Sequence, residues 1–282
     1  MAHRLSGHFL RGPAGPLATV LVEPQEREAT FAVLHLPAFA EEMNKARRAV
    51  ALAARELADR GAMVAIVDPR GTGDSGGEHR DATWAGWQSD ATCAWQWLCE
   101  RCRGPRVLWG LRLGALLAAD AMQTRHIEPD LLLLWQPVLS GKLFFTQFLR
   151  LAVAQQVTAA GDKGRSAHDL RAMLDAGTSP EIAGYDLHPR LVSGAEAVEL
   201  AAFTPRCPVI WRETSVATPP SLSPAAAGAC ARWRSAGVQM DVVAVSGPSF
   251  WASAEIAEAP ELCLSTGVAV SSCLFPHRVG AS

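Results

Sequence analysis

The clearest pattern along the chain is a series of short apolar runs separated by longer segments of mixed polarity. Polar residues hardly interrupt these runs, which is typical of strands that are covered on both faces. The predicted strands are Thr30–Leu36, Ala62–Asp68, Arg106–Trp109, Leu131–Trp135, Pro208–Trp211 and Val238–Val245.

Between the runs, apolar residues recur at the spacing of an amphipathic helix. In Glu41–Arg60 they fall three or four positions apart, and Gly61 follows where helices commonly end. Strands that alternate with helices predict the α/β class, with a mostly parallel sheet covered by helices on both faces. The predicted helices are Glu41–Arg60, Trp84–Cys102, a segment after Gly114 through Met122, Pro224–Ala236 and Pro260–Cys273.

The alternation is interrupted between about residues 140 and 205. Helical patches are predicted at Leu143–Gln156 and Ala167–Leu174, and no clear strand is expected there. A long helical insertion at this point in a parallel sheet suits a cap over the active face. We therefore predict a single domain over residues 1–282, with a helical cap at about 140–205.

Composition and charge narrow the class of protein. The 282 residues are 49% hydrophobic, which is enough to form a core. With a formal charge of −2, the chain lacks the excess positive charge that is typical of nucleic-acid-binding proteins. Met1–Pro16 has no apolar signal-peptide core, and uninterrupted apolar runs are shorter than the ~20 residues of a membrane span. We predict a cytoplasmic protein, and the sequence leaves its oligomeric state open.

The cysteines suggest no metal site or disulfide framework. Their number, seven, is odd, and they are scattered along the chain. Cys99 and Cys102 form a C-x-x-C, but no second pair or histidine cluster completes a zinc site. A structural pair of thiols is the favoured interpretation, and redox chemistry is a remote alternative. No cofactor or metal is predicted.

The strongest signal for chemistry is the turn Gly110-Leu111-Arg112-Leu113-Gly114 between a strand and a helix. Such a glycine-flanked turn is the setting of the nucleophile in the α/β-hydrolase fold, and it aims its central side chain at the mouth of the sheet. Here that residue is Arg112, which cannot act as a nucleophile. Leu111 and Leu113 flank it and are predicted to contact a ligand.

Other positions follow the same fold in order. His35-Leu36-Pro37-Ala38-Phe39 lies where hydrolases carry the oxyanion loop, and Asp68–Gly77 resembles the D-x-R-G-x-G-x-S loop after the next strand. The remaining triad positions depart from the Ser-His-Asp pattern. Glu213 is the nearest candidate for the acid, and Phe250 fills the place of the histidine.

Three segments carry a narrower resemblance: His35–Arg47, the Asp68–Gly77 loop and Gly110–Ala115. They resemble the exosortase A system-associated hydrolase 2 family, over about residues 17 to 262. The resemblance implies an α/β-hydrolase fold, and a bacterial setting of exopolysaccharide synthesis and exosortase-dependent protein sorting. It also implies that an arginine at the turn belongs to the family's pattern.

Arg112 has two interpretations. At a helix N-terminus it is a candidate clamp for a carboxylate or phosphate of a ligand. A buried cation needs a partner, so the alternative is a salt bridge to Glu41, Glu42 or Glu213 that closes the old active site. Glu41 and Glu42 suit the first turn of a helix in any case, but a desolvated glutamate there is also the best candidate to activate water.

Five further residues are candidates for ligand contact. His35 orients the oxyanion loop or donates to a ligand, although a hydrogen bond to backbone is the simpler role. Asp74 and Ser75 border the predicted mouth, where Ser75 is more simply a turn residue than a displaced nucleophile. Phe39 is predicted to contact a ligand. Phe250, with Trp251 and the cap residues Phe144, Phe145 and Phe148, is predicted to line an acyl pocket, although aromatic residues at helical spacing are more often core.

The first functional prediction is a hydrolase of an acyl or ester-type substrate in an exopolysaccharide and exosortase pathway. Arg112 would stabilise an oxyanion, and Glu41 or Glu42 would activate water. The alternative is a non-catalytic protein that kept the fold and binds an anionic ligand or a protein partner through Arg112 and the cap.

Overall fold

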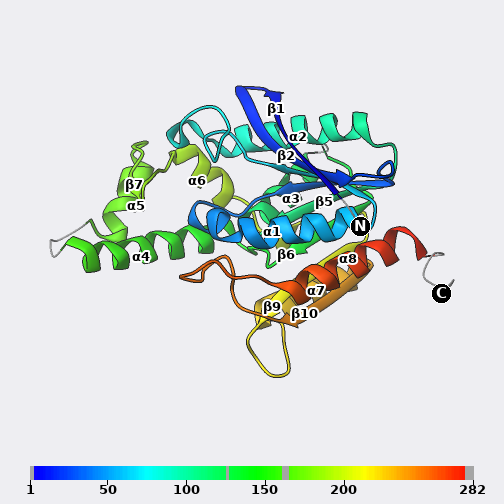
Figure 1. The fold of residues 1–282 in the computed structure, drawn as a ribbon. Helices are drawn as coiled ribbons and strands as arrows, with labels where there is room; N and C mark the ends of the chain where they lie inside the picture. The colour runs from blue at the N-terminus through cyan, green and yellow to red at the C-terminus, as the bar shows by residue number, and fades with distance from the viewer. Residues whose placement is uncertain (1–2, 125–126, 161–164, 277–282) are drawn as a thin grey trace.

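The computed structural model describes residues 3–124, 127–160 and 165–276, and an eight-stranded sheet forms its centre (Figure 1). The strands lie in the order β1-β2-β4-β3-β5-β6-β9-β10. All neighbours from β4 to β10 are parallel, whereas β2 runs antiparallel to β1 and β4. The strands are β1 His3–Gly12, β2 Gly15–Pro24, β3 Phe31–Leu36, β4 Ala62–Val67, β5 Arg106–Leu111, β6 Leu131–Trp135, β9 Val209–Ser215 and β10 Met240–Ser246.

The predicted α/β class and mostly parallel sheet are confirmed, and each predicted strand is present. The differences lie at strand ends. β5 and β9 run past their predicted ends because Leu111 still pairs with Trp135, and Ser215 with Ser246. β10 begins at Met240, after the predicted start at Val238.

The amino-terminal hairpin of β1 and β2 is a feature that the apolar pattern does not predict. Leu10 pairs with Leu17 and both are buried, but Leu5 and Phe9 are 59% and 69% exposed. β1 is an edge strand, so few of its side chains reach the core. Such a strand carries a weak apolar signal because only part of it contributes to packing.

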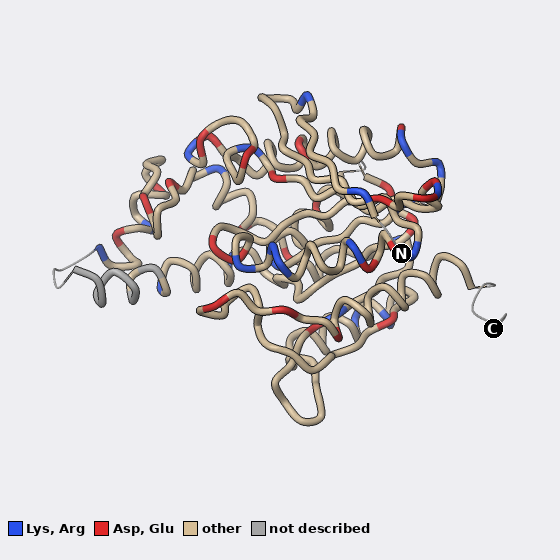
Figure 2. The backbone as a smooth tube through the Cα atoms, viewed as in Figure 1, with Lys and Arg blue, Asp and Glu red and all other residues tan. Residues whose placement is uncertain are grey.

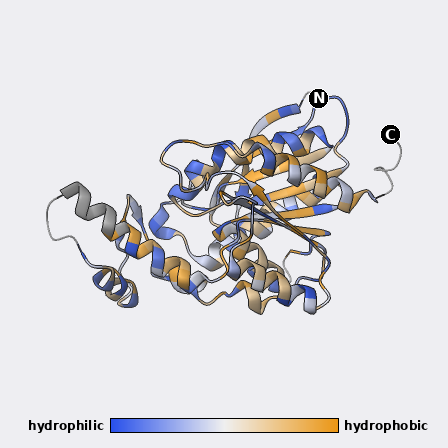
Figure 3. Cartoon of the chain, turned by 90° about the horizontal axis from the view of Figure 1, so that it is seen from below, coloured by the Kyte–Doolittle hydropathy of each residue, from blue (hydrophilic) through white to orange (hydrophobic). Residues whose placement is uncertain are grey.

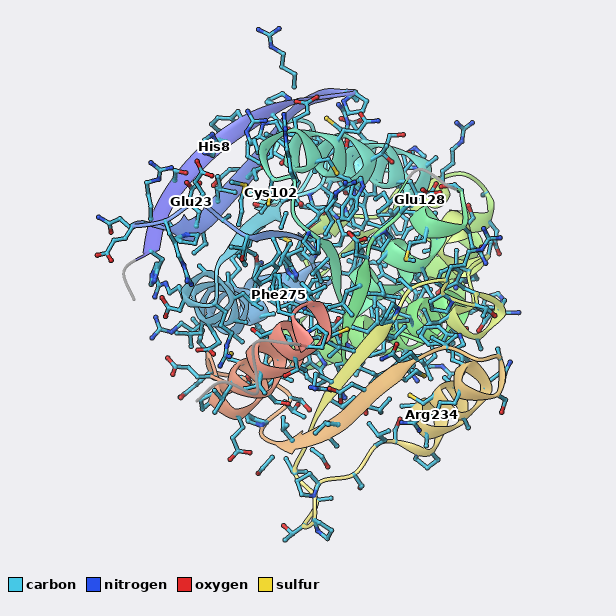
Figure 4. The ribbon with its side chains drawn as sticks, turned by 90° about the vertical axis from the view of Figure 1, so that its right-hand side faces the viewer. His8, Glu23, Cys102, Glu128, Arg234 and Phe275 are labelled. Carbon is cyan, nitrogen blue, oxygen red and sulfur yellow. The ribbon has the colours of Figure 1, made fainter. Side chains whose placement is uncertain are left out.

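Helices cover both faces of the sheet (Figures 1 and 4). α1 and α8 pack on one face, and α2, α3 and α7 pack on the other, with β1 and β10 at opposite edges. β3 supplies both cores, since Ala32 and Leu34 face the α2 side while Phe31 and Val33 face the α1 side. The helices are α1 Glu41–Asp59, α2 Trp84–Arg101, α3 Leu113–Gln123, α7 Pro224–Ser235 and α8 Pro260–Leu274.

α1 shows how the sequence positions one part of the site. The apolar residues that predict this helix are all buried against the sheet, and Gly61 follows its end with a φ of 103°. Because these apolar residues face the sheet, the polar first turn of α1 lies at the carboxyl ends of the parallel strands. Glu41 and Glu42 therefore reach the edge of the sheet where α/β proteins bind ligands.

The segment between β6 and β9 projects from the body of the molecule (Figures 1 and 3). Both predicted helical patches are present in it, and α4 begins slightly earlier than predicted. The expectation of no strand there is wrong, because two short strands form a tight antiparallel hairpin. The elements are α4 Gly141–Ala160, α5 Ala167–Asp175, β7 Glu181–Ile182, β8 Tyr185–Asp186 and α6 Pro189–Glu196. We call residues 141–196 the insertion.

Along the described backbone, Lys and Arg residues are interspersed with Asp and Glu residues (Figure 2). In the part of the chain that the structure describes, no helix has the length and apolar character needed to cross a bilayer.

Candidate functional site

The turn between β5 and α3 keeps the backbone of a nucleophile position although its central residue is an arginine. Arg112 has a φ of 55° and a ψ of −118°, a conformation that L-residues rarely adopt. The glycines on either side allow the tight approach. A Cβ on Gly110 would lie 2.4 Å from Ala115 Cα, and one on Gly114 would lie 2.2 Å from the carbonyl oxygen of Leu36.

Arg112 forms an ion pair with Glu42 of α1. Its Nη2 lies 2.9 Å from Oε1 of Glu42, and its Nε lies 3.2 Å from Oε2. A longer bond joins Nη1 to the carbonyl oxygen of Gln136 at 3.4 Å, and the guanidinium carbon lies 5.2 Å from the ring centre of Trp251. Both side chains of the pair are about one-fifth exposed, at 21% and 23%. Of the three carboxylates predicted as partners, Glu42 is the one in direct contact.

Burial and charge act on Glu42 in opposite directions. Removal of the carboxylate from water raises the pKa of Glu42, and the positive charge and hydrogen bonds of Arg112 lower it. Burial is the larger influence, so the net direction is upward. A carboxylate whose pKa is raised toward neutrality is a stronger base than an ordinary glutamate.

Glu213 provides a second carboxylate near Arg112. It lies near the carboxyl end of β9, is 5% exposed, and its Oε1 accepts a hydrogen bond of 2.9 Å from Nε1 of Trp211. Burial raises the pKa of Glu213, while hydrogen bonds from Trp211 and the Ser223 amide, and the charge of Arg112, lower it less. No direct hydrogen bond links the described Glu213 and Arg112 side chains. Arg112 is therefore hydrogen-bonded to Glu42 but not to Glu213.

Glu41 does not join this cluster. It is exposed, and its Oε1 accepts a hydrogen bond of 2.9 Å from the hydroxyl of Tyr185, in β8 of the insertion. Asn44 donates to the same hydroxyl at 3.1 Å. The carboxylate raises the pKa of Tyr185 to about 12, together with burial, which is the larger cause. The glutamates that begin α1 therefore face different partners: Glu42 meets the turn and Glu41 meets the insertion.

Phe250, which the sequence predicts at the place of the catalytic histidine, is a core residue. Phe250 is fully buried, and its ring lies 6.0 Å from that of Trp135 and 5.1 Å from that of Trp251. It packs in the core on the α1 side of the sheet and presents no base. Ser249 next to it is exposed.

The Asp68–Gly77 loop uses its polar groups to hold itself together. Ser75 is 9% exposed; its hydroxyl donates to the carbonyl oxygen of Asp68 at 2.5 Å and accepts from the amide of Ala18 at 2.8 Å. The amide of Asp74 donates to the Asp68 carboxylate at 3.4 Å, and the Asp74 side chain is exposed. Ser75 thus occupies a turn and has no base beside it.

His35 and Phe39 lie on opposite sides of the oxyanion loop. His35 is 1% exposed and packs against Trp109 at a tilted angle, with ring centres 4.3 Å apart. Phe39 is 1% exposed and packs among the aromatic rings of α4 in the insertion. Leu111 and Leu113 are also buried, on the α1 and α2 sides respectively.

The backbone of the turn offers a second donor. The amide of Leu113 is the first of α3, and among the described residues no acceptor within the chain takes its hydrogen bond. A helix N-terminus carries partial positive charge, and its first amides are free to bind an anion. The arrangement therefore combines a guanidinium, an amide, the partly exposed carboxylate of Glu42 and the buried carboxylate of Glu213, without a serine.

Three contacts of the site lie outside the sequence prediction. Gln136 follows β6 with a φ of 43°; its carbonyl oxygen accepts a hydrogen bond from Arg112, and its side-chain oxygen accepts one from the amide of Thr214. Trp251 offers its ring face to Arg112, and Tyr185 reaches Glu41 from a hairpin that the pattern does not reveal. Residues so far apart in sequence are brought together only by the fold. Among the described residues, no group of three or more His, Cys, Asp or Glu side chains is arranged to hold a metal ion.

Comparisons with solved structures show the same fold. Est1E from Butyrivibrio proteoclasticus, solved with ferulic acid bound, has a TM-score of 0.65 and 13% identity, over 95% of this chain and 99% of that one. An esterase from Pyrococcus furiosus has a TM-score of 0.63 and 12% identity, over 96% and 91%. An α/β serine hydrolase without a lid from Xanthomonas campestris has a TM-score of 0.56 and 17% identity, over 99% and 97%.

The family comparison covers the part of the chain that holds the turn and most of the insertion. Residues 30–179 match the family described as serine aminopeptidase, S33. No curated protein matches the sequence. The matched residues make up more than half of the chain, and they include the turn that carries Arg112. The chain therefore belongs to the serine aminopeptidase S33 family of the α/β-hydrolase superfamily.

Proposed function

We propose that this protein hydrolyses an acyl or ester-type substrate without a serine nucleophile. The observation that carries the proposal is the Arg112–Glu42 pair, with 2.9 Å between Nη2 and Oε1, at the turn where the fold holds its nucleophile. The pair places a fixed positive charge and a desolvated carboxylate at the point where acyl chemistry takes place in this fold.

The proposed reaction uses one water molecule. Glu42 takes a proton from the water as its oxygen attacks the carbonyl carbon of the substrate. Negative charge gathers on the carbonyl oxygen, where the Arg112 guanidinium and the Leu113 amide stabilise it. The intermediate then reforms the carbonyl group and breaks the bond to the leaving oxygen. Glu42 returns the proton to that oxygen, so the products are an acid and an alcohol.

Steady-state hydrolysis of a series of nitrophenyl esters with graded acyl chains tests this mechanism. We expect Glu42→Gln and Arg112→Ala each to lower kcat/KM by roughly 100-fold or more, because a general base and an oxyanion donor each contribute on that scale. Glu258→Gln is the matched control, since Glu258 pairs with Arg48 in an exposed ion pair, with side chains 49% and 53% exposed. Equal turnover in all variants would refute the mechanism.

The resemblance of three segments to the exosortase-associated family supports a proposal for the biological setting. We place the protein in the cytoplasm of a bacterium, as a single domain whose insertion acts as a cap, in a pathway of exopolysaccharide synthesis and protein sorting. The contact between Tyr185 and Glu41 supports the cap, because it joins the insertion to the first turn of α1 at 2.9 Å. Deletion of the gene should change the acyl content of the exopolysaccharide, and an unchanged polymer would argue against this setting.

A second function is favoured by one observation, the buried Phe250 at the position of the histidine base. Without that base, the fold can serve as a non-catalytic receptor for an anionic ligand or a protein partner, with Arg112 as the contact. A receptor predicts a rise in melting temperature with acyl carboxylates and no ester turnover. It also predicts that Arg112→Ala abolishes the rise, whereas Glu258→Gln retains it.

A further inference from the structure

A separate cavity of about 170 Å³ lies beneath α1, on the face of the sheet opposite α2. Its wall is mostly apolar and is built from the sheet and from the inner face of α1. The apolar contacts that matter here come from Val20, Val50, Ala51, Ile66 and Leu111.

One polar side chain in the wall lacks a partner. His35 is 1% exposed and lines the cavity, and its Nδ1 is buried without a hydrogen bond among the described residues. Burial, and secondarily the charge of Arg47, lower the pKa of His35 to about 3, so the ring is neutral at physiological pH. A neutral imidazole has one donor and one acceptor nitrogen, so Nδ1 can accept a hydrogen bond when the proton is on Nε2.

The alternation of side chains along β3 places the His35 side chain on the side of the sheet that holds this cavity. Phe31 and Val33 point to the α1 side of the strand, and side chains two residues apart share a face. His35 continues that series at the end of the strand, over Trp109 on β5, which also faces α1. The acceptor therefore belongs to the α1 face of the sheet.

The rim of the cavity carries two opposite charges that form an ion pair. Nη2 of Arg47 lies 3.1 Å from the Asp68 carboxylate, with side chains 44% and 11% exposed. Val20, at 39% exposure, lies on β2 at the surface. The arginine is thus already paired, which disfavours an anionic ligand, and the apolar wall disfavours a cation.

We propose that this cavity binds a small uncharged molecule that has an apolar body and one hydroxyl group, with the hydroxyl donating to Nδ1 of His35. An engineered apolar cavity of ~150 Å³ holds benzene, so a body of about six or seven carbon atoms fits the volume. Water is a poor occupant, because a buried water needs two to four polar partners and the wall offers it one acceptor. This site goes beyond the proposed hydrolysis at Arg112, and its occupation requires no turnover.

Benzyl alcohol and toluene are matched probes, because they differ in the hydroxyl group alone. Binding is measured by calorimetry with the full chain, and we expect benzyl alcohol to bind about tenfold more tightly than toluene, the usual net value of one hydrogen bond. Ala51→Met fills the cavity and should abolish binding of both probes. Ala85→Met, on the exposed side of α2, is the control and should leave both affinities unchanged.

The role of His35 is tested by a variant and by a spectrum. His35→Phe should bind benzyl alcohol and toluene with equal affinity. In case this variant does not fold, the ¹⁵N resonance of Nδ1 in the wild type should shift with benzyl alcohol and stay unchanged with toluene. Equal affinity for the two probes, no binding of either, or binding that survives Ala51→Met would overturn the proposal.

Discussion

Two loops at the mouth of the sheet keep the backbone of the fold but use their side chains differently. In the Asp68–Gly77 loop, the Ser75 hydroxyl binds the backbone of the loop and of β2, so its polarity is spent on structure. In the turn between β5 and α3, the central side chain binds a different element, through Glu42 of α1. Backbone shape and side-chain chemistry are therefore separable here. The glycines fix the shape, and the residue at the tip is free to change.

The largest expected effect breaks the shape of the turn. Gly114→Ala places a Cβ 2.2 Å from the carbonyl oxygen of Leu36, so we expect a loss of about 3 kcal/mol in the free energy of unfolding. Gly228→Ala is the control, because Gly228 lies in α7 with open space around it. That change should stabilise the protein by about 0.5–1 kcal/mol. Urea denaturation measures both, and equal effects would show that close approach does not set the turn.

The next effect tests the structural use of the other loop. Ser75→Ala leaves the buried amide of Ala18 and the carbonyl of Asp68 without their partner, so we expect a loss of about 2 kcal/mol. Ser249→Ala, at an exposed position, should change stability by less than about 0.5 kcal/mol. We expect both variants to keep the ester turnover of the wild type. A loss of turnover in Ser75→Ala at unchanged stability would make this serine a nucleophile.

A smaller effect sharpens the comparison at the turn itself. Glu42→Gln removes one charge of a pair whose side chains are about one-fifth exposed, so we expect a loss of about 1–2 kcal/mol, less than for a fully buried pair. Glu258→Gln removes a carboxylate from an exposed pair and should cost at most about 0.5 kcal/mol. Thermal unfolding at low salt distinguishes the two, and similar losses would mean that the pair at the turn behaves as a surface pair.

The smallest effect is a change in the pH dependence of stability. Burial raises the pKa of Glu213, so the folded chain binds more protons than the unfolded chain in the pH range above the ordinary glutamate value. The stability that Glu213 contributes is fully present below the pKa of Glu213 in the unfolded chain. It is lost as the pH rises through the pKa of Glu213 in the folded chain. Glu213→Gln should therefore flatten the fall of stability as the pH rises above about 4.5, the ordinary pKa of a glutamate. A steeper fall in the variant would contradict a raised pKa.

The sequence predicts the central sheet well because five of its strands, β3, β4, β5, β6 and β9, are largely buried and appear as plain apolar runs. It misses the β1–β2 hairpin, where Phe9 is exposed at 69%, and the short hairpin at Tyr185, because neither has a continuous apolar face. In the site, the glycine spacing around Arg112 reveals the turn. The choice of Glu42 over Glu41 and Glu213 depends on the direction in which α1 presents its first turn, which no local pattern encodes.

The central claim is that hydrolysis takes place at this turn without a serine nucleophile. The most direct test is the intact mass of the protein after treatment with a fluorophosphonate, combined with ester turnover of the treated sample. The account predicts an unmodified mass and retained turnover, which Arg112→Ala removes. A stoichiometric adduct mapped to Ser75 or Ser249, with loss of turnover, would contradict it.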